Sequence, residues 1–340
     1  MKKVLSLLLV LVLCFSFSAC GNNDVPVESE PETENEIVNE EATVIRIASL
    51  KGPTSMGLVN LYDKADKQQL NYDLEYTISG AADEITPLLV NGEIDAAAIP
   101  ANLASVLYNK TEGKLVVAAV NTLGVLYVVD PGDDIQSIED LRGKTIYTTG
   151  KGTTPEYALD YVLEKNGLDP DTDVKIEFSS EATEVTSLLT SDISGNAVAV
   201  LPQPYVTAAL AQNETLRIAL SLAEEWDKVA DDSKLVTGVL VFNKEFASSN
   251  PKLVQSFMDD YSASISMTAD DVDTTAALIE QYGIVAKAPI AKKALPFCNI
   301  TFITGSDMKT VLSGYLQTLY DKSPAAVGGN LPADEFYFGA

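Results

Sequence analysis

The sequence contains no histidine at any of its 340 positions. This absence excludes active sites in which a histidine activates a serine or cysteine nucleophile. It also removes the commonest side-chain ligand of transition metals. Cysteine is scarce as well, since only Cys14, Cys20 and Cys298 are present. We therefore expect a protein that is not an enzyme and has neither a metal site nor a cofactor.

Basic residues are also few. The chain has 23 lysines and arginines against 49 aspartates and glutamates, a formal net charge of -26. Nucleic-acid binding requires a basic face that contacts phosphates, so this balance argues against DNA and RNA as partners. An acidic surface mainly keeps a protein soluble.

The first twenty residues have the layout of a secretory signal. Lys2 and Lys3 precede an apolar run over residues 4–17, and the small residues Ser18 and Ala19 stand before Cys20. The run is too short for a membrane span, and acidic rather than basic residues follow it. The pattern resembles a lipoprotein box and predicts removal of residues 1–19 and lipidation of Cys20, with palmitate among the acyl chains. The alternatives are an ordinary signal peptide and an uncleaved span.

The segment after Cys20 is strongly acidic. Residues 21–41 include eight acidic residues, no basic ones, and two prolines. Such a composition cannot bury enough apolar surface to fold, so residues 20–42 are predicted to be a disordered tether. If Cys14 is removed and Cys20 carries lipid, Cys298 has no partner for an intramolecular disulfide, and stability must come from an apolar core.

From residue 43 the chain alternates strand and helix patterns, and the alternation repeats after about a hundred residues. Residues 92–100 match residues 195–202, and each segment ends in a proline that precedes a helix rich in alanine and leucine. The repeat predicts two similar Rossmann-like α/β lobes, each with a mostly parallel sheet. The predicted strands cover residues 44–49, 72–77, 94–99 and 115–120 in the first lobe, and 145–149, 174–178, 198–201 and 216–220 in the second.

Ligands of such sheets bind beyond the carboxyl ends of the strands. Two glycine-containing turns occupy these corners, residues 51–57 after the first strand and residues 150–156 after its counterpart. Both combine hydroxyl side chains with backbone N–H groups at a helix start, which suits an anion or a polar acceptor. An alternative for residues 153–156 is a helix-capping box without a ligand.

Other strand ends carry small or polar residues that point to the same place. Lys51 and Lys151 are the only cations of the two turns. Trp226 follows the last strand of the second lobe, either as a stacking platform at the cleft mouth or on a surface helix. The candidate ligand-binding residues are Lys51, Pro53, Thr54, Ser55, Met56, Ala81, Ala82, Pro100, Asn102, Asn121, Thr122, Gly152, Thr153, Thr154, Pro155, Gln203, Tyr205 and Thr237.

Three segments carry a family resemblance: SIEDLRGKT at 137–145, GKGTTPEYAL at 150–159 and LPQPYVTAA at 201–209. They resemble the solute-binding proteins of ABC importers, and most closely the group that binds nitrate, sulfonates, taurine and thiamine precursors. The resemblance implies a periplasmic binding protein fold of type II, with two lobes joined by a two-strand hinge. It places lobe one at residues 43–122 and 241–340 and lobe two at residues 123–240.

The resemblance also implies a function. We expect an extracytoplasmic, lipid-anchored monomer that captures a small polar or anionic molecule, such as a sulfonate or carboxylate, and delivers it to an ABC permease. One alternative ligand is a neutral heterocycle such as a thiamine-precursor pyrimidine, held by Asn102, Asn121, Gln203 and a tyrosine. Alternatives of another class are a sensory lipoprotein without a transport role and a pyrimidine-synthase-like enzyme. That enzyme would require a histidine and a cysteine cluster.

Overall fold

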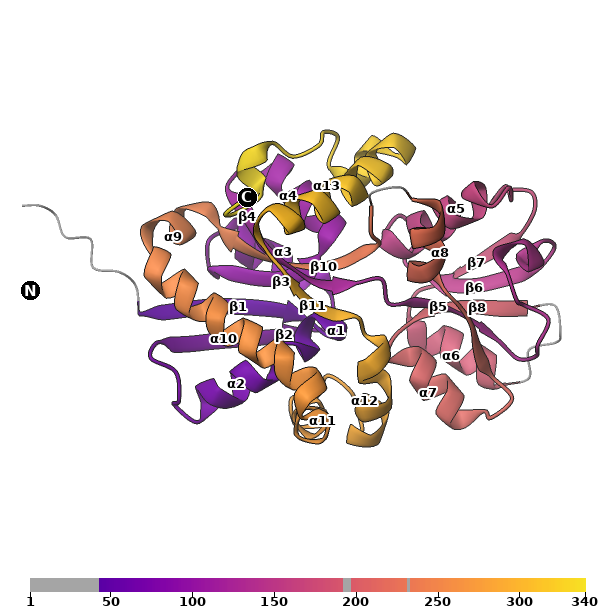
Figure 1. Ribbon diagram of the computed structural model, residues 1–340, viewed down its shortest axis with the longest axis horizontal. Coiled ribbons are helices and arrows are strands. Elements are labelled where there is room, and N and C mark those ends of the chain that lie inside the picture. The colour runs from indigo at the N-terminus through magenta and orange to yellow at the C-terminus, as the bar shows by residue number, and fades with distance from the viewer. Residues whose placement is uncertain (1–42, 192–196, 231–232) are drawn as a thin grey trace, which may run out of the picture. The chain divides into compact units, whose positions relative to one another are not determined.

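Two β-sheets with helices on their faces make up the fold, seen in a computed structural model that describes residues 43–191, 197–230 and 233–340 (Figure 1). These residues belong to a single compact unit. The predicted signal peptide, the lipidation site Cys20 and the acidic tether lie outside the described residues. In the described part of the chain, none of the helices combines the length and apolarity needed to cross a bilayer.

The first sheet has six strands in the order β11-β4-β10-β3-β1-β2. Strand β4, which lies next to the edge strand β11, is buried along nearly its whole length, as expected for an apolar run covered on both faces. The strands are β1 (Val44–Leu50), β2 (Asp73–Ser79), β3 (Ala96–Pro100), β4 (Leu115–Leu123), β10 (Val236–Asn243) and β11 (Ile300–Ile303). The connecting helices are α1 (Pro53–Met56), α2 (Val59–Asp66), α3 (Ala82–Val90) and α4 (Ala101–Lys110).

The second sheet has five strands in the order β7-β6-β8-β5-β9. Its strands are β5 (Leu126–Asp130), β6 (Thr145–Thr149), β7 (Lys175–Ser179), β8 (Ala197–Pro202) and β9 (Arg217–Ser221). The helices that follow them are α5 (Thr154–Lys165), α6 (Ala182–Thr190), α7 (Tyr205–Gln212) and α8 (Leu222–Val229), and a 3₁₀ turn, η1 (Ile138–Leu141), precedes β6.

The two sheets repeat one arrangement, which confirms the predicted duplication. Strand β1 pairs in parallel with β2 and β3, and β6 pairs in parallel with β7 and β8. In each sheet the next strand is antiparallel: β10 beside β3, and β5 beside β8. These two antiparallel strands are those that follow the crossings of the chain between the sheets. The family resemblance places the changes of lobe at residues 122–123 and 240–241, and the sequence patterns did not predict the short edge strand β11.

The turn after β1 leads into two helices. The sequence predicted one helix start at residues 51–57, whereas α1 and α2 are separate helices on either side of Gly57 and Leu58. A β-carbon on Gly57 would lie 3.1 Å from side-chain atoms of both Ile265 and Ile300. The glycine therefore lets this turn pack closely against the C-terminal part of the chain.

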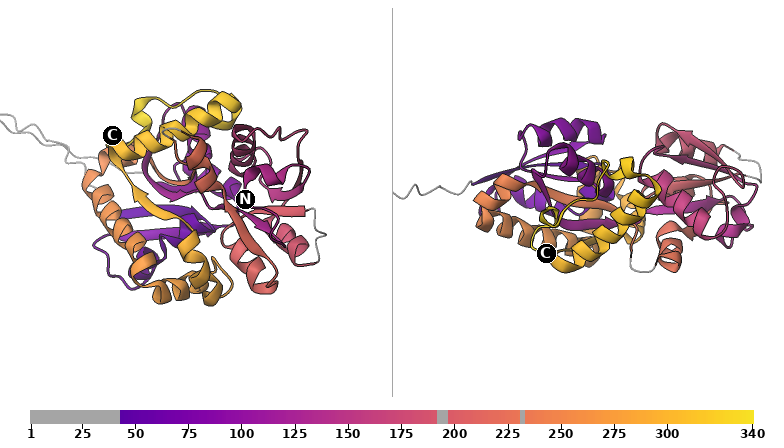
Figure 2. Two further views of the ribbon diagram at one scale, coloured as in Figure 1. Left: turned by 45° about the vertical axis from the view of Figure 1, so that its right-hand side comes forward. Right: turned by 90° about the horizontal axis from the view of Figure 1, so that it is seen from above.

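The C-terminal part of the chain returns to the first sheet and covers both of its faces. Phe257 and Tyr261 of α10 (Pro251–Asp270) join one apolar cluster, and Leu312 and Tyr315 of α13 (Gly305–Lys322) join the other. Figure 1 shows α10 running obliquely to β1 and β2, and Figure 2 shows the orange helices beside the indigo strands in two further views. These elements are α9 (Lys244–Ser249), α10 (Pro251–Asp270), α11 (Val272–Gln281), α12 (Ala288–Ala294), η2 (Leu295–Phe297), α13 (Gly305–Lys322), η3 (Pro324–Val327) and η4 (Asp334–Phe336).

One apolar cluster continues from the first sheet to the second. It contains residues of α5, α8 and α13, with Trp226 fully buried among them. The indole ring lies 4.2 Å from the ring centre of Tyr161 and 5.9 Å from that of Tyr315, and its N–H donates to Ser233 Oγ at 3.1 Å. Trp226 is therefore not a stacking platform at a cleft mouth. Its helix α8 has an exposed face, but the tryptophan lies on the buried one. The tryptophan belongs to the core that joins α5 to α13.

Candidate functional site

The carboxyl ends of the parallel strands bring most candidate residues to the edges where the two sheets are connected. The chain crosses directly from β4 to β5 through residues 124–125, and it returns from β9 through α8 to β10. Strands β4 and β10 pair at the crossing, with Leu123 opposite Val236. The candidate residues are therefore divided between the two sheets, which are connected through the neighbouring strands β4 and β10.

Two candidate corners touch each other directly. Thr154 begins α5, Asn102 lies in the first turn of α4, and Thr154 Oγ1 donates to Asn102 Oδ1 at 3.3 Å. The Thr154 hydroxyl also shares a 3.1 Å hydrogen bond with the Tyr315 hydroxyl. Burial raises the pKa of Tyr315, although its hydrogen bond to Thr154 opposes that rise. Asn102 Nδ2 donates to the Ala326 carbonyl, so the polar atoms of this contact already have partners.

The corner after β1 is mostly satisfied within the protein. Thr54 and Ser55 both donate to the Leu50 carbonyl, at 2.8 and 2.6 Å, and Ser55 Oγ also donates to Ser49 Oγ at 2.8 Å. Met56 is fully buried, with its sulfur 3.7 Å from the Cys298 sulfur. Lys51 is exposed. Pro53 is half-buried and is the first residue of α1, directly before the buried Thr54. The hydroxyls of this turn act chiefly as caps of the strand end.

The corner after β6 is a tight turn that uses several of its own donors. The Thr153 hydroxyl donates to the Gly150 carbonyl at 2.6 Å, and the Gly152 N–H donates to the Glu156 carboxylate. The Thr153 side chain makes no hydrogen bond to the helix start, so the reciprocal capping box does not form. The Glu156 carboxylate brings negative charge to the turn that was predicted to attract an anion.

The remaining corner residues differ in exposure. Ala81 is exposed before α3, while Ala82, Pro100 and Pro155 are partly buried. Lys151 is exposed, and its Nζ lies 5.7 Å from the centre of the Phe178 ring. Tyr205 is 36% exposed at the start of α7 and lines a cavity, while partial burial raises the pKa of its phenol.

Three candidate residues have buried polar atoms without a hydrogen-bond partner among the described residues: Asn121 Nδ2, Gln203 Nε2 and Thr237 Oγ1. A buried donor without a partner costs about 1–3 kcal/mol. Asn121 and Thr237 belong to the first sheet, and Gln203 follows β8 of the second. Each sheet thus provides at least one donor whose desolvation is uncompensated.

The oxygen atoms of the two amides are already occupied. Gln203 Oε1 accepts from the backbone N–H of Thr207 at 3.3 Å and from its hydroxyl at 2.8 Å. Asn121 Oδ1 accepts from the Thr122 hydroxyl at 3.0 Å. Because a backbone N–H is always a donor, the contact to Thr207 sets which way the Gln203 amide points. The Gln203 atom without a partner is therefore an N–H group.

Two residues at this edge were missed by sequence reasoning. A β-carbon on Gly238 would lie 2.4 Å from Thr54 Cγ2 and 2.6 Å from Asn121 Oδ1, so only glycine fits between them. The buried Tyr261 hydroxyl also lacks a full hydrogen bond; burial raises its pKa, and the neighbouring Asn121 side chain opposes the rise. A glycine inside the apolar strand β10 was the available signal for the close approach.

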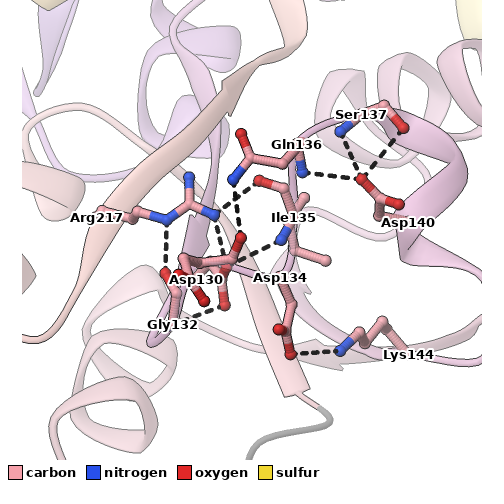
Figure 3. A network of polar contacts seen from close by, with 10 residues as sticks. Asp130, Gly132, Asp134, Ile135, Gln136, Ser137, Asp140, Lys144 and Arg217 are labelled. Carbon is pink, nitrogen blue, oxygen red and sulfur yellow. Dashed lines mark hydrogen bonds and ion pairs between the residues drawn. The ribbon is translucent and has the colours of Figure 1, made fainter.

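A polar network lies at the end of β5 and the start of β9 (Figure 3). It includes part of the first family-like segment, residues 137–145. The Arg217 guanidinium donates to Asp130 Oδ2 at 2.9 Å and to the Ile135 carbonyl at 2.7 Å. Ser137 and Asp140 form a capping box around η1, and backbone N–H groups there lower the pKa of Asp140. This segment orders the loop before β6 and provides none of the candidate ligand contacts.

Comparison with known proteins gives the family context. Residues 67–290 match a protein family described as "ABC transporter, phosphonate, periplasmic substrate-binding protein". No curated protein matches the chain.

Solved structures give a consistent result. An ABC transporter protein from Parabacteroides distasonis is 25% identical, with a TM-score of 0.73 over 87% of this chain and 98% of that one. The aliphatic sulphonate-binding protein SsuA from Escherichia coli is 17% identical, with a TM-score of 0.68 over 85% and 91%. The nitrate-binding protein NrtA from Synechocystis is 13% identical, with a TM-score of 0.59 over 86% and 83%. The last two show the fold, and they confirm the predicted type II periplasmic binding protein architecture.

Proposed function

The chain belongs to the phosphonate-type periplasmic substrate-binding proteins of ABC transporters, and on that premise we propose that its ligand is a small anion with a sulfonate, phosphonate or carboxylate group. The observation that carries this proposal is the set of buried donors without partners, Asn121 Nδ2, Gln203 Nε2 and Thr237 Oγ1. A ligand rich in acceptor oxygens would complete all three.

The donor character of these atoms favours an anion over the neutral heterocycle. An aminopyrimidine presents N–H groups as well as acceptors and would need free protein acceptors in the site. The amide oxygens of Asn121 and Gln203 are instead occupied by Thr122 and Thr207. The relatives named for sulphonate and nitrate binding also bind oxyanions. In this proposal neutral donors hold the anion, while Lys51 and Lys151 lie exposed in the turns after β1 and β6.

We propose that capture of the ligand is coupled to closure of two lobes. One lobe comprises residues 43–122 and 241–340, and the other comprises residues 123–240. A ligand drives closure only if it binds the closed state more tightly than the open one. Donors on both lobes would meet that condition, because an anion between Asn121 and Gln203 would contact both lobes at once. We propose binding and release without covalent chemistry and transfer to an ABC permease.

Lipid anchoring is a separate proposal. A lipid on Cys20 and a tether of roughly twenty residues would hold the binder near its permease and raise its effective concentration. A Cys20→Ala chain should appear in the soluble fraction, bind ligand as before and support uptake poorly. Membrane retention of the variant would contradict the anchor and leave the ligand proposal untouched.

Thermal unfolding of the full chain with added ligands tests the proposed ligand class. Methanesulfonate, methylphosphonate and acetate are compared with a neutral aminopyrimidine. A ligand at a hundredfold excess over its Kd stabilises the folded state by about 2.7 kcal/mol, which is a clear rise in Tm. A rise with at least one anion and none with the pyrimidine supports the proposal. A rise with the pyrimidine alone would overturn it in favour of the heterocycle.

A further inference from the structure

A cavity of about 850 Å³ lies where the chain passes between the two sheets. Its walls are the end of β4 and the start of β5, strand β9 with helix α8, and the segment around η2. None of the candidate ligand-binding residues, all of which the structure describes, lines this cavity. Its volume falls in the range of sites for organic molecules, roughly 300–1,000 Å³. The cavity is therefore large enough for a ligand of its own.

An exposed aromatic ring forms part of the wall. Phe297 of η2 is 43% exposed, whereas most large apolar side chains of the described residues are buried. The Tyr127 hydroxyl of β5 donates to the Phe297 carbonyl at 2.6 Å, and the two rings meet edge to face with their centres 6.3 Å apart. Leu123 and Leu235 add apolar surface to the same lining. The cavity thus offers an aromatic and apolar surface that neighbouring strands hold in place.

The charged part of the lining has an excess of carboxylates. Three carboxylates and two lysines line the cavity. Each lysine is paired with one carboxylate: Lys228 lies 2.7 Å from Glu225. Lys234 lies 2.5 Å from Asp227. The third carboxylate, Glu224, forms no ion pair with a described residue. Negative charge in this cavity is therefore not fully neutralised by the protein.

Glu225 is the buried member of this group. Its side chain is only 9% exposed, and the lysine with which it pairs is 64% exposed. That pair uses Oε1 of the carboxylate. Because solvent screens a buried charge less than an exposed one, this carboxylate attracts a further cation more strongly than a carboxylate on the open surface does. The lining therefore favours a positively charged ligand over the anion proposed for the candidate site.

From these observations we infer that the cavity is a second ligand site, which binds an organic cation with its ammonium group beside Glu224 and Glu225 and its carbon body against Phe297. An aromatic ring attracts an ammonium group placed over its face, and burial of the carbon body against the apolar wall is favourable. The net charge of -26 of the whole chain adds a general attraction for cations. The inference goes beyond the proposed function and does not depend on it, because the two sites share no residue.

Calorimetric titration of the full chain with benzylammonium chloride tests the inference. The comparison compounds are benzyl alcohol, which lacks the charge, and methylammonium, which lacks the ring. Benzylammonium should bind one site per chain, about five- to thirtyfold more tightly than benzyl alcohol, since the ion-pair and cation–π contributions add. It should also bind at least about tenfold more tightly than methylammonium, which buries no ring. A benzylammonium affinity equal to that of either comparison compound, or no saturable binding, would overturn the inference.

Two variants and one control assign the binding to the cavity. Glu224→Gln removes the carboxylate without an ion pair, and Phe297→Leu removes the ring but keeps an apolar side chain. Each should weaken benzylammonium binding about two- to fivefold, and Glu224→Gln should leave the binding of benzyl alcohol unchanged. Glu214→Gln is the control, because it removes an exposed carboxylate outside the lining. Unchanged affinity in both cavity variants, or an equal loss in the control, would contradict the inference.

Discussion

Thr154 Oγ1 lies 3.3 Å from Asn102 Oδ1, so that the first turns of α5 and α4 meet although they follow strands of different sheets. Tyr315 of α13 joins the same contact through a 3.1 Å hydrogen bond to the Thr154 hydroxyl. The apolar cluster around Trp226 extends this contact between α5 and α13. On this side the two halves of the molecule are held together by specific polar and apolar interactions.

Replacing Thr154 with valine tests whether this contact belongs to the ligand-bound state. The variant keeps the shape of the side chain and loses both hydrogen bonds, each with a net contribution of about 0.5–1.5 kcal/mol. We expect a three- to tenfold fall in anion affinity by calorimetry, because closure becomes less favourable. Thr111→Val is the control, since that hydroxyl bonds only within its own helix end. An equal fall in both variants would contradict a special role for Thr154.

Gly150 and Gly152 form a matched pair for testing the turn after β6. Both have positive φ, at 76° and 74°, which costs an alanine about 1–2 kcal/mol. A β-carbon at Gly150 would also lie 2.8 Å from Pro155 Cγ, whereas at Gly152 nothing lies within 4 Å. Gly150→Ala should therefore lower the free energy of unfolding by about 1–3 kcal/mol more than Gly152→Ala in denaturant titrations. Equal losses of unfolding free energy in the two variants would show that the turn accommodates the β-carbon at Gly150 without strain, and would contradict this prediction.

The burial of Asp160 beside Lys322 predicts that the stability of the protein depends on pH. Lys322 of α13 donates to Glu164 Oε1 at 2.8 Å and lies 3.6 Å from Asp160 Oδ2, both on α5. Burial raises the pKa of Asp160 from 3.8 to about 6, and Lys322 only partly offsets it. The folded state thus binds the proton more tightly than the unfolded state does, so this group's contribution to stability falls as the pH rises from about 4 to 6.

Asp160→Asn removes the titrating carboxyl, and with it the loss of stability at higher pH. A difference of about two pKa units corresponds to at most about 3 kcal/mol, and solvent screening reduces our expectation to about 1–2 kcal/mol at pH 7.5. The gain should vanish below about pH 3, where Asp160 is protonated in both states. Chemical unfolding at both pH values measures it, with Glu164→Gln as the control that removes the closer partner of Lys322. A variant less stable than the parent chain at pH 7.5 would contradict this account.

The duplicated architecture was accessible from the sequence because it depends on local patterns. Pro100 and Pro202 both end apolar strands and precede a helix, and this repeated order indicated two similar sheets. The four-residue strand β11 was not accessible, since its only strand signal is pairing with β4, almost 180 residues earlier.

The candidate site was predictable as a set of strand ends but not as a set of contacts. The hydroxyls after β1 looked like ligand donors, yet Ser55 bonds to Ser49 and Leu50. Glu156 takes the N–H of Gly152, a contact set by the shape of the turn. The missing partner of Gln203 Nε2 is likewise a three-dimensional property, because it depends on every group packed around the amide.

The most direct test of the central claim is calorimetric anion affinity, measured with the stability of the ligand-free chain, for Thr237→Val and Gln203→Met. These changes remove donors on different sheets that lack partners. If the donors await an anion, each variant should bind at least about tenfold more weakly, a loss of about 1.4 kcal/mol. Thr237→Val should also make the ligand-free chain more stable by about 1 kcal/mol, since an unpaired buried hydroxyl is gone. Unchanged affinity in both variants would contradict the account.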